Sequence, residues 1–293
     1  MFRWSTRKIT GMDASRLLSI QTSRRVFLAG LSSFVPLLSG CGNSADEAVV
    51  LTESELIKRE RAAIERLKEL GCKVQEAEDQ WLQTSGILVH LASEHIDDEG
   101  RILAEVFREF RNLRRLFLVV DGTPIQKSGL AQLVDLDNLL LLSAQWTPTD
   151  DDGISQIQGI VSLRLLRLNW SQISDDGLKY IDRLPDLLML YLSGTKVTDE
   201  GAVRIARLKQ LTSLQLSHTP VTDFSVKQLA SLADLAHLGL DATKITDACV
   251  PSLKSLKSLR YLNVSETALS RDGLLELSET LPDCQIVQKD MKG

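Results

Sequence analysis

The sequence lacks a hydrophobic run long enough to cross a bilayer and lacks a stripe of basic residues, and both absences narrow its function. Its apolar stretch at 26–38 covers 13 residues, whereas a membrane-spanning helix needs about 20. The net charge is −5, and the first 41 residues carry six basic side chains and one acidic one, so the remainder carries −10. An acidic body without clustered Lys and Arg argues against nucleic-acid binding, which requires neutralised phosphates.

Catalytic and metal-binding motifs are also missing. The sequence has no G-x-S-x-G, no phosphate-cradling glycine loop and no H-E-x-x-H. The histidines are not paired with cysteine at zinc-ligand spacing, and we expect all of them to be exposed repeat residues: His90, His95, His218 and His237. The acidic run from Thr149 to Gly153 suggests calcium, but its alignment with the other repeats favours a helix start. The sequence therefore predicts no enzyme, no cofactor and no metal site.

The cysteines after Cys41 offer no disulfide. Cys72 and Cys284 lie at opposite ends of the predicted stack of repeats, roughly 35 Å apart on the usual strand spacing, so they cannot pair. Cys249 replaces a glycine of the repeat, and we expect it to be a small buried side chain.

A unit of 24 residues recurs along the chain and decides its architecture. Aligned copies begin at Asn138, Ser162, Asp186, Gln210, Asp234 and Ser258. Two irregular copies precede them at 85–111 and 112–137, and the second has extra residues around Val119 and Val120. A fixed period of about 20 to 29 residues with this leucine spacing is typical of a leucine-rich-repeat solenoid.

Each copy predicts a strand, a turn and a short outer helix. In the copy at Asp186, three leucines point inward: Leu187, Leu190 and Leu192. Thr195 recurs as Ser or Thr, and its hydroxyl can hydrogen-bond the turning backbone. Thr198 is then a helix N-cap, and Asp199 lies favourably near the helix amino end. Stacked in parallel, the strands form one curved sheet with the helices outside.

Segments at both ends are predicted to cover the exposed edges of the repeats. Residues 52–84 form a helical cap, in which Thr52 and Glu55 start a helix and Gly71 ends it. Eight repeats occupy 85–281, and residues 282–293 form a C-terminal cap and tail with a closing strand. The segment 42–51 is a short tether.

The repeat form L-x-x-L-x-L-x-x-T-x-[IV]-[TS]-D-x-G resembles that of bacterial leucine-rich-repeat proteins, and it is similar to the repeats of eukaryotic F-box and ribonuclease-inhibitor-like proteins. The resemblance covers about 85–281. It implies an α/β solenoid, shaped as a curved horseshoe with a parallel concave sheet and short outer helices. It also implies recognition of a protein or peptide on that sheet, although the fold alone does not determine a function.

The first 41 residues resemble an export signal. Ser23-Arg24-Arg25-Val26-Phe27-Leu28 resembles the twin-arginine motif, an apolar core follows, and Leu38-Ser39-Gly40-Cys41 resembles a bacterial lipobox. This resemblance implies cleavage before Cys41, acylation of its thiol and a lipid anchor on the periplasmic side of the cell envelope. Met12 is an alternative start to Met1.

The residues that alternate with the inward leucines form the predicted binding surface. In the central copies they are unusually apolar and aromatic, with Trp146 and Trp170 at the same repeat position. Aromatic side chains beside an arginine are the composition of an interface hot spot. The residues expected to contact a partner are Trp146, Arg167, Trp170, Met189, Tyr191 and Gln215.

Two alternatives remain open at this stage. The same side chains could partly fill the spaces between strands, as in any solenoid, and the protein would then be an architectural component of the envelope without a specific ligand. If the chain is not exported, its repeats would instead belong to an intracellular adaptor.

Overall fold

A ten-stranded sheet forms the body of the protein, seen in a computed structural model that describes residues 51–79 and 82–289. The strands follow one another in chain order; β1 is antiparallel to β2, and every later pair is parallel. The strands are β1 (Lys73–Asp79), β2 (Thr84–His90), β3 (Leu116–Val119), β4 (Leu139–Ser143), β5 (Leu165–Arg167), β6 (Met189–Tyr191), β7 (Ser213–Gln215), β8 (His237–Gly239), β9 (Tyr261–Asn263) and β10 (Gln285–Val287). Arg24, Arg25, Cys41 and nearly all of the tether lie outside the described residues.

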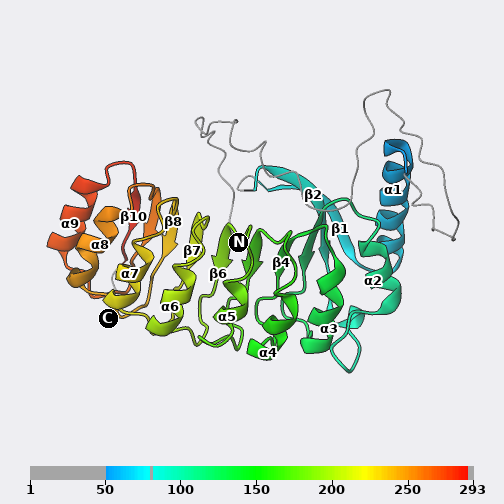
Figure 1. Cartoon of the computed structure of the whole chain (residues 1–293), viewed down its shortest axis with the longest axis horizontal. Helices are drawn as coiled ribbons and strands as arrows, with labels where there is room; N and C mark the ends of the chain where they lie inside the picture. The colour runs from blue at the N-terminus through cyan, green and yellow to red at the C-terminus, as the bar shows by residue number, and fades with distance from the viewer. Residues whose placement is uncertain (1–50, 80–81, 290–293) are drawn as a thin grey trace, which may run out of the picture. The chain divides into compact units, whose positions relative to one another are not determined.

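Helices alternate with the strands from β2 onward, and they line one side of the sheet (Figure 1). The α-helices are α1 (Glu53–Glu69), α2 (Ala104–Phe110), α3 (Lys127–Gln132), α4 (Asp151–Ile154), α5 (Leu178–Ile181), α6 (Asp199–Ile205), α7 (Asp223–Leu229), α8 (Val250–Ser255) and α9 (Arg271–Thr280). Short 3₁₀ turns are η2 (Ser93–His95), η3 (Leu133–Asp135), η4 (Ser155–Ile157) and η5 (Asp247–Cys249). None of the helices in the described ranges has the length and apolar character that a membrane span requires.

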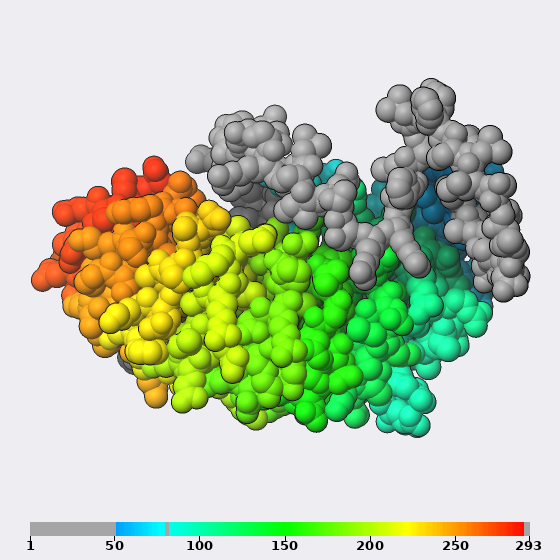
Figure 2. All heavy atoms as spheres, in the orientation of Figure 1, coloured from blue at the N-terminus to red at the C-terminus, as the bar shows by residue number. Residues whose placement is uncertain are grey.

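One continuous apolar core lies between the sheet and the helices. The leucines predicted to point inward are all buried in it, including Leu187, Leu190 and Leu192. The side chains of the helices meet them from the other side, as Ala202 and Ile205 of α6 do at 0% exposure. Each repeat borders the preceding and following ones along the described body (Figure 2), so its apolar faces are buried by its neighbours.

The predicted role of the recurring hydroxyl is confirmed. Thr195 Oγ1 donates to the Leu192 carbonyl at 2.6 Å, and Thr147 Oγ1 does the same to the Ala144 carbonyl at 2.8 Å. The equivalent bond forms at Thr123, Ser171, Thr219, Thr243 and Thr267. The hydroxyl thus gives the carbonyl at the turn out of the sheet a short hydrogen bond, beside the longer one from the Thr195 N–H at 3.3 Å.

The helix starts combine a predicted cap with a contact between repeats. Thr198 caps α6 by accepting from the Glu200 N–H, as predicted. The adjacent Asp199 also reaches into the next repeat, where it accepts from the Thr222 N–H at 2.9 Å and from Thr222 Oγ1 at 2.7 Å. The same brace recurs at Asp151, Asp175, Asp223 and Asp247, and we call these five residues the aspartate column.

The irregular copy at 112–137 shows no extra residues at the predicted place, and the bulge in this part of the ladder belongs to the next copy, which begins at Asn138. Leu116 pairs with Leu139 but Phe117 pairs with Leu141, so Leu140 bulges out of the ladder. The prediction around Val119 and Val120 is therefore wrong. From Leu118 onward the strands keep the 24-residue register, because Leu118 pairs with Leu142 and the next rung pairs Leu142 with Leu166.

The N-terminal end consists of a helix and an antiparallel hairpin. Thr52 and Glu55 form the predicted capping box of α1, and Gly71 follows its end at φ +87°. Arg114 bonds Glu60 of α1 with its Nε at 2.8 Å, which ties the helix to the first repeats. The part of the predicted cap that follows α1 forms the β1 strand, which pairs antiparallel with β2.

His95 corrects the expectation that all four histidines are exposed. It is 2% exposed, because the first repeat and the end of α1 close around it. Its Nδ1 accepts from the Ala92 N–H at 2.9 Å, and its Nε2 lies 3.1 Å from the Leu70 carbonyl. The ring therefore donates from Nε2 and links α1 to the first repeat.

Candidate binding surface

The face of the sheet opposite the helices, here called the open face, carries two rows of side chains. One row begins with apolar residues and becomes polar: Leu88, Phe117, Leu141, Leu165, Met189, Ser213, His237 and Tyr261. The other row contains His90, Val119, Ser143, Arg167, Tyr191, Gln215, Gly239 and Asn263. Both rows continue the alternation that places the leucines in the core.

The apolar part of the first row forms a second hydrophobic cluster. Its buried members are Leu82, in the link between β1 and β2, and the strand residues Phe117, Val119, Leu141, Leu165 and Met189. Met189 is only 1% exposed, so its expected place among the surface residues is wrong, because neighbouring apolar side chains cover it. Met189 thus supports the surface from beneath and does not form part of it.

A column of left-handed residues borders the open face, where each strand turns toward its helix. In seven consecutive repeats one residue has φ between +52° and +68°: Gly122, Trp146, Trp170, Gly194, His218, Ala242 and Glu266. Each donates its N–H to the next repeat, as Trp146 does to the Asn169 carbonyl at 3.0 Å. This conformation suits glycine and costs other L-residues about 1–2 kcal/mol each. Tryptophan and histidine therefore occupy it against their local preference.

The two tryptophans of this column form an exposed stack. Their ring centroids are 4.8 Å apart with an interplanar angle of 11°, and the Trp170 ring continues toward His218 at 5.5 Å. Gly194 makes room for this arrangement, because a Cβ there would lie 2.3 Å from the Trp170 ring. Trp146 is 62% exposed although one face is covered by Trp170. Its other face, on the side of Gly122, is therefore open.

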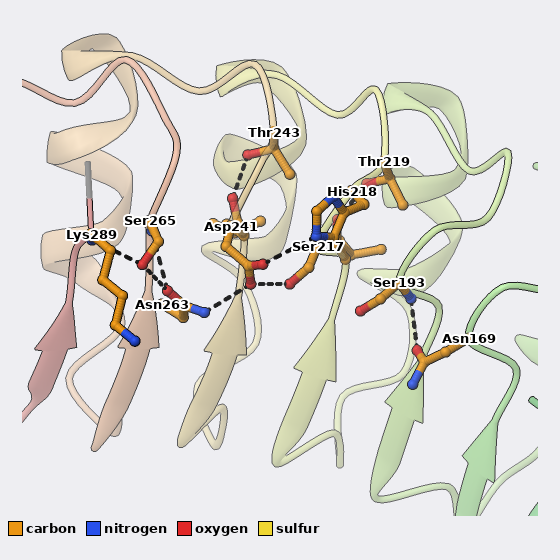
Figure 3. Close-up of polar contacts among 12 residues, drawn as sticks. Asn169, Ser193, Ser217, His218, Thr219, Asp241, Thr243, Asn263, Ser265 and Lys289 are labelled. Atoms are coloured by element: carbon orange, nitrogen blue, oxygen red, sulfur yellow. Dashed lines mark hydrogen bonds and ion pairs between the residues drawn. The ribbon is translucent and has the colours of Figure 1, made fainter. Parts of the chain in front are cut away.

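A polar column lies one residue before the left-handed column, and side-chain hydrogen bonds link its members within two stretches, from Asp121 to Ser193 and from Ser217 onward. Asp121 accepts from Gln145 Nε2 at 3.0 Å, and Asn169 Nδ2 donates to Gln145 Oε1 at 2.6 Å. In the later repeats, Asp241 accepts from Ser217 Oγ and Asn263 Nδ2, and it faces His218 Nε2 at 3.7 Å (Figure 3). These polar side chains satisfy one another, so they hold the turns in place.

Arg167 and Tyr191 occupy the middle of the open face. The guanidinium carbon of Arg167 lies 5.5 Å from the Tyr191 ring centroid, in the range of a cation–π contact. Gln215 follows Tyr191 in the row, and its amide lies over Gly239, where a Cβ would collide with it. The expected contact residues thus separate into the Trp146–Trp170 stack at the border and a group of Arg167, Tyr191 and Gln215 on the strands.

Burial shifts the pKa of thiols and imidazoles among the described residues. Burial raises the pKa of the Cys249 thiol to about 12 and that of Cys72 to about 11, with added repulsion from Asp223 and Glu94 respectively. Burial also lowers the pKa of the His237 imidazole. In the described part of the chain, no group of three or more His, Cys, Asp or Glu is placed to hold a metal ion.

Sequence reasoning found the tryptophans but missed the backbone that presents them. A signal was present, because Gly122 and Gly194 share their repeat position with Trp146 and Trp170. Glycine at some copies of a repeat position indicates a left-handed backbone in all of them. The burial of Met189 had no such signal, since it depends on which apolar side chains pack around it in space.

Comparison with known proteins supports the fold. The leucine-rich repeat family matches residues 161–181. The crystal structure of an internalin C2 from Listeria monocytogenes is similar with a TM-score of 0.54 and 24% identity, over 69% of this chain and 80% of that one. The Arabidopsis receptor kinase HAESA, solved with the peptide hormone IDA and the co-receptor SERK1, has a TM-score of 0.40 and 15% identity over 54% of this chain and 27% of that one. No curated protein sequence matches the chain. With its parallel strands alternating with helices, the protein has the leucine-rich-repeat fold.

Proposed function

We propose that this protein is an exported, lipid-anchored binding module that takes a protein or peptide partner on its open face. Leucine-rich-repeat solenoids provide extended surfaces that such partners commonly use. The observation that carries the proposal is the exposed Trp146–Trp170 stack on left-handed backbone. Exposed aromatic rings contribute strongly to protein interfaces, and backbone strain at a surface position indicates a use other than folding.

A second candidate is an architectural envelope protein without a specific ligand. The hydrogen-bonded polar column favours this candidate, because such a column makes the repeats rigid and needs no ligand to explain it. It gives no reason for two large aromatic residues at 62% and 39% exposure. We therefore favour the binding module.

Capture from a cell-envelope extract tests the partner. The full chain is immobilised beside the double variant Trp146→Ala/Trp170→Ala and beside Phe224→Ala, which removes an exposed aromatic ring on the helix side. We expect a defined, saturable partner to be retained by the wild type and by Phe224→Ala and lost by the double variant. Circular dichroism should be the same for all three. Equal capture by the double variant, or capture of nothing by the wild type, would overturn the proposal.

The anchor rests on the sequence of the first 41 residues and is tested separately. Intact mass is measured for the membrane-extracted protein, for Cys41→Ser, and for Arg24→Lys/Arg25→Lys. Export and lipidation predict a mature chain that begins at Cys41 and carries acyl mass, and neither variant should yield it. An unprocessed chain in the cytosol would remove the anchor from the proposal, and the repeats would then belong to an intracellular adaptor.

A further inference from the structure

Arg167 is a charged residue on the open face without a counter-charge. It is half-buried, and its Nε is fully buried without a hydrogen-bond acceptor. Within the described residues it takes part in no ion pair, and its polar partner is the face of the Tyr191 ring. A buried donor without an acceptor is rare in folded proteins and calls for an explanation.

Other arginines of the chain show what a satisfied guanidinium looks like here. Arg114 bonds Glu60 at 2.8 Å, and Arg207 reaches Asp182 at 3.2 Å. Arg260, near β9, donates to the carbonyls of Leu259 and Lys257 at 2.9 and 3.2 Å. Arg167 differs from them because its Nε is buried without a partner, although the chain beyond its first 41 residues carries a charge of −10 and is rich in carboxylates.

The surroundings of Arg167 hold the guanidinium in place and leave its end groups unused. Its row neighbours are Ser143 on β4, which is fully buried and bonds Asp121, and Tyr191 on β6. Tyr191 holds the guanidinium at 5.5 Å. The two Nη groups donate to no described residue. A planar pair of donors in a fixed position matches the two oxygens of a carboxylate.

We propose that Arg167 binds a carboxylate of the partner, supplied by an Asp or Glu side chain. This inference rests on the proposed function and names the chemistry of the partner. The Nη groups would donate to the two carboxylate oxygens, and the ion pair would supply the counter-charge that the free protein lacks. A side chain fits better than a chain terminus, because aromatic residues lie in repeats on both sides of the one that holds Arg167: Trp146 in the preceding repeat, and His237 and Tyr261 on the later strands β8 and β9. A partner segment that contacts both sides passes over Arg167 and does not end there.

Selection from a displayed library of random nine-residue peptides tests the charge preference. The full chain is compared with Arg167→Glu and with Arg260→Glu, a charge reversal at an arginine that its own backbone satisfies. Wild type and Arg260→Glu should enrich one Asp or Glu position, and Arg167→Glu should replace it with Lys or Arg. A selected acidic peptide should bind Arg167→Glu at least tenfold more weakly, and it should bind equally well with a free or an amidated C-terminus.

The outcomes separate this inference from the function on which it rests. Enriched peptides without an acidic position would contradict the inference and leave the binding function intact, and a requirement for the free C-terminus would overturn the choice of a side chain. No enrichment by the wild type would contradict both.

A structural role for Arg167 predicts a different result in the free protein. Arg167→Met keeps the length of the side chain and removes the charge with its unpaired Nε. If the arginine serves a partner, this variant melts at or slightly above the wild-type temperature and loses the acidic peptide. A clear fall in melting temperature, with peptide affinity retained, would show that Arg167 supports the fold and would overturn the inference.

Discussion

The aspartate column and the left-handed column recur with the same 24-residue period, but they follow different rules. Five consecutive repeats hold aspartate at this position, Asp151, Asp175, Asp199, Asp223 and Asp247, and each carboxylate accepts a hydrogen bond from the following repeat. In the left-handed column five of seven positions hold residues other than glycine. The first column contains what folding requires, and the second contains large side chains that folding alone would not select.

This difference indicates where to look for function in a repeat protein. Scaffold positions can be recognised because the same physical demand selects the same residue in each copy. Positions that hold a residue unsuited to the local backbone conformation in neighbouring copies, as Trp146 and Trp170 do, are candidates for binding. Substitutions in the two columns should therefore have opposite consequences for stability and for partner capture.

The largest effect is expected in the aspartate column, from Asp199→Ala. It removes the acceptor of the Thr222 N–H, of Thr222 Oγ1 and of Ser225 Oγ. Loss of stability of about 2–3 kcal/mol is expected, because partly buried donors are left without partners. Urea unfolding measures it, with Asp234→Ala at an exposed site as the control. A loss equal to that of the control would contradict the bracing role.

A smaller loss, about 2 kcal/mol, is expected from Gly194→Ala in the left-handed column. Its φ is +68°, and the new Cβ would lie 2.3 Å from the Trp170 ring. The ring must then leave its place beside His218, so tryptophan fluorescence should change as well. Unchanged emission together with unchanged stability would show that Gly194 does not make room for the stack.

Acid should lower the stability of the fold by protonating Asp199, and this loss should be smaller than the loss caused by Asp199→Ala. Burial works to raise the pKa of Asp199, but hydrogen bonds from Ser225 and Thr222 outweigh it and lower the pKa. Asp199 therefore stabilises the fold fully above the pKa of an unfolded aspartate, about 3.9, and loses this contribution as pH falls toward the lower folded-state pKa. Asp199→Asn should show a smaller fall in melting temperature between pH 6 and pH 3 than the wild type. Parallel curves would rule out this linkage.

The smallest effects test the backbone of the left-handed column without touching the stack. Gly122→Ala places a Cβ in open space at φ +68°, and Ala242→Gly removes one at φ +52°. The first should lower stability by about 0.5–1 kcal/mol and the second should raise it by a similar amount. Thermal unfolding of the two variants compares them directly. The same sign for both would mean that the conformation is not strained.

The scaffold could be predicted well from the sequence, because the contacts that form it lie within one repeat and recur in the next. The inward leucines, the hydroxyl of Thr195 and the cap of Thr198 each follow from contacts within one repeat. The contact of Asp199 with Thr222 was missed, since it depends on the distance between stacked repeats. His95 was assigned to the surface because its burial requires α1 to pack against the first repeat.

The candidate site was predicted only in part. Trp146 and Trp170 were identified from their shared repeat position, and the structure adds that they are stacked. Met189 was expected at the surface, but the apolar side chains clustered with it on the open face leave it 1% exposed. The unpaired state of Arg167 could not be predicted, because it depends on which side chains surround the guanidinium in space.

The central claim is that the tryptophan stack serves binding and not folding, and Trp146→Gly/Trp170→Gly tests it most directly. Glycine relieves two strained backbone positions and removes the rings, so the loss of stacking is offset in part. Unfolding free energy and partner capture are measured on the same preparations, beside the wild type. We expect the free energy to stay within about 1 kcal/mol of wild type while capture is lost. A large fall in stability with capture retained would show that the stack supports the fold and would contradict the account.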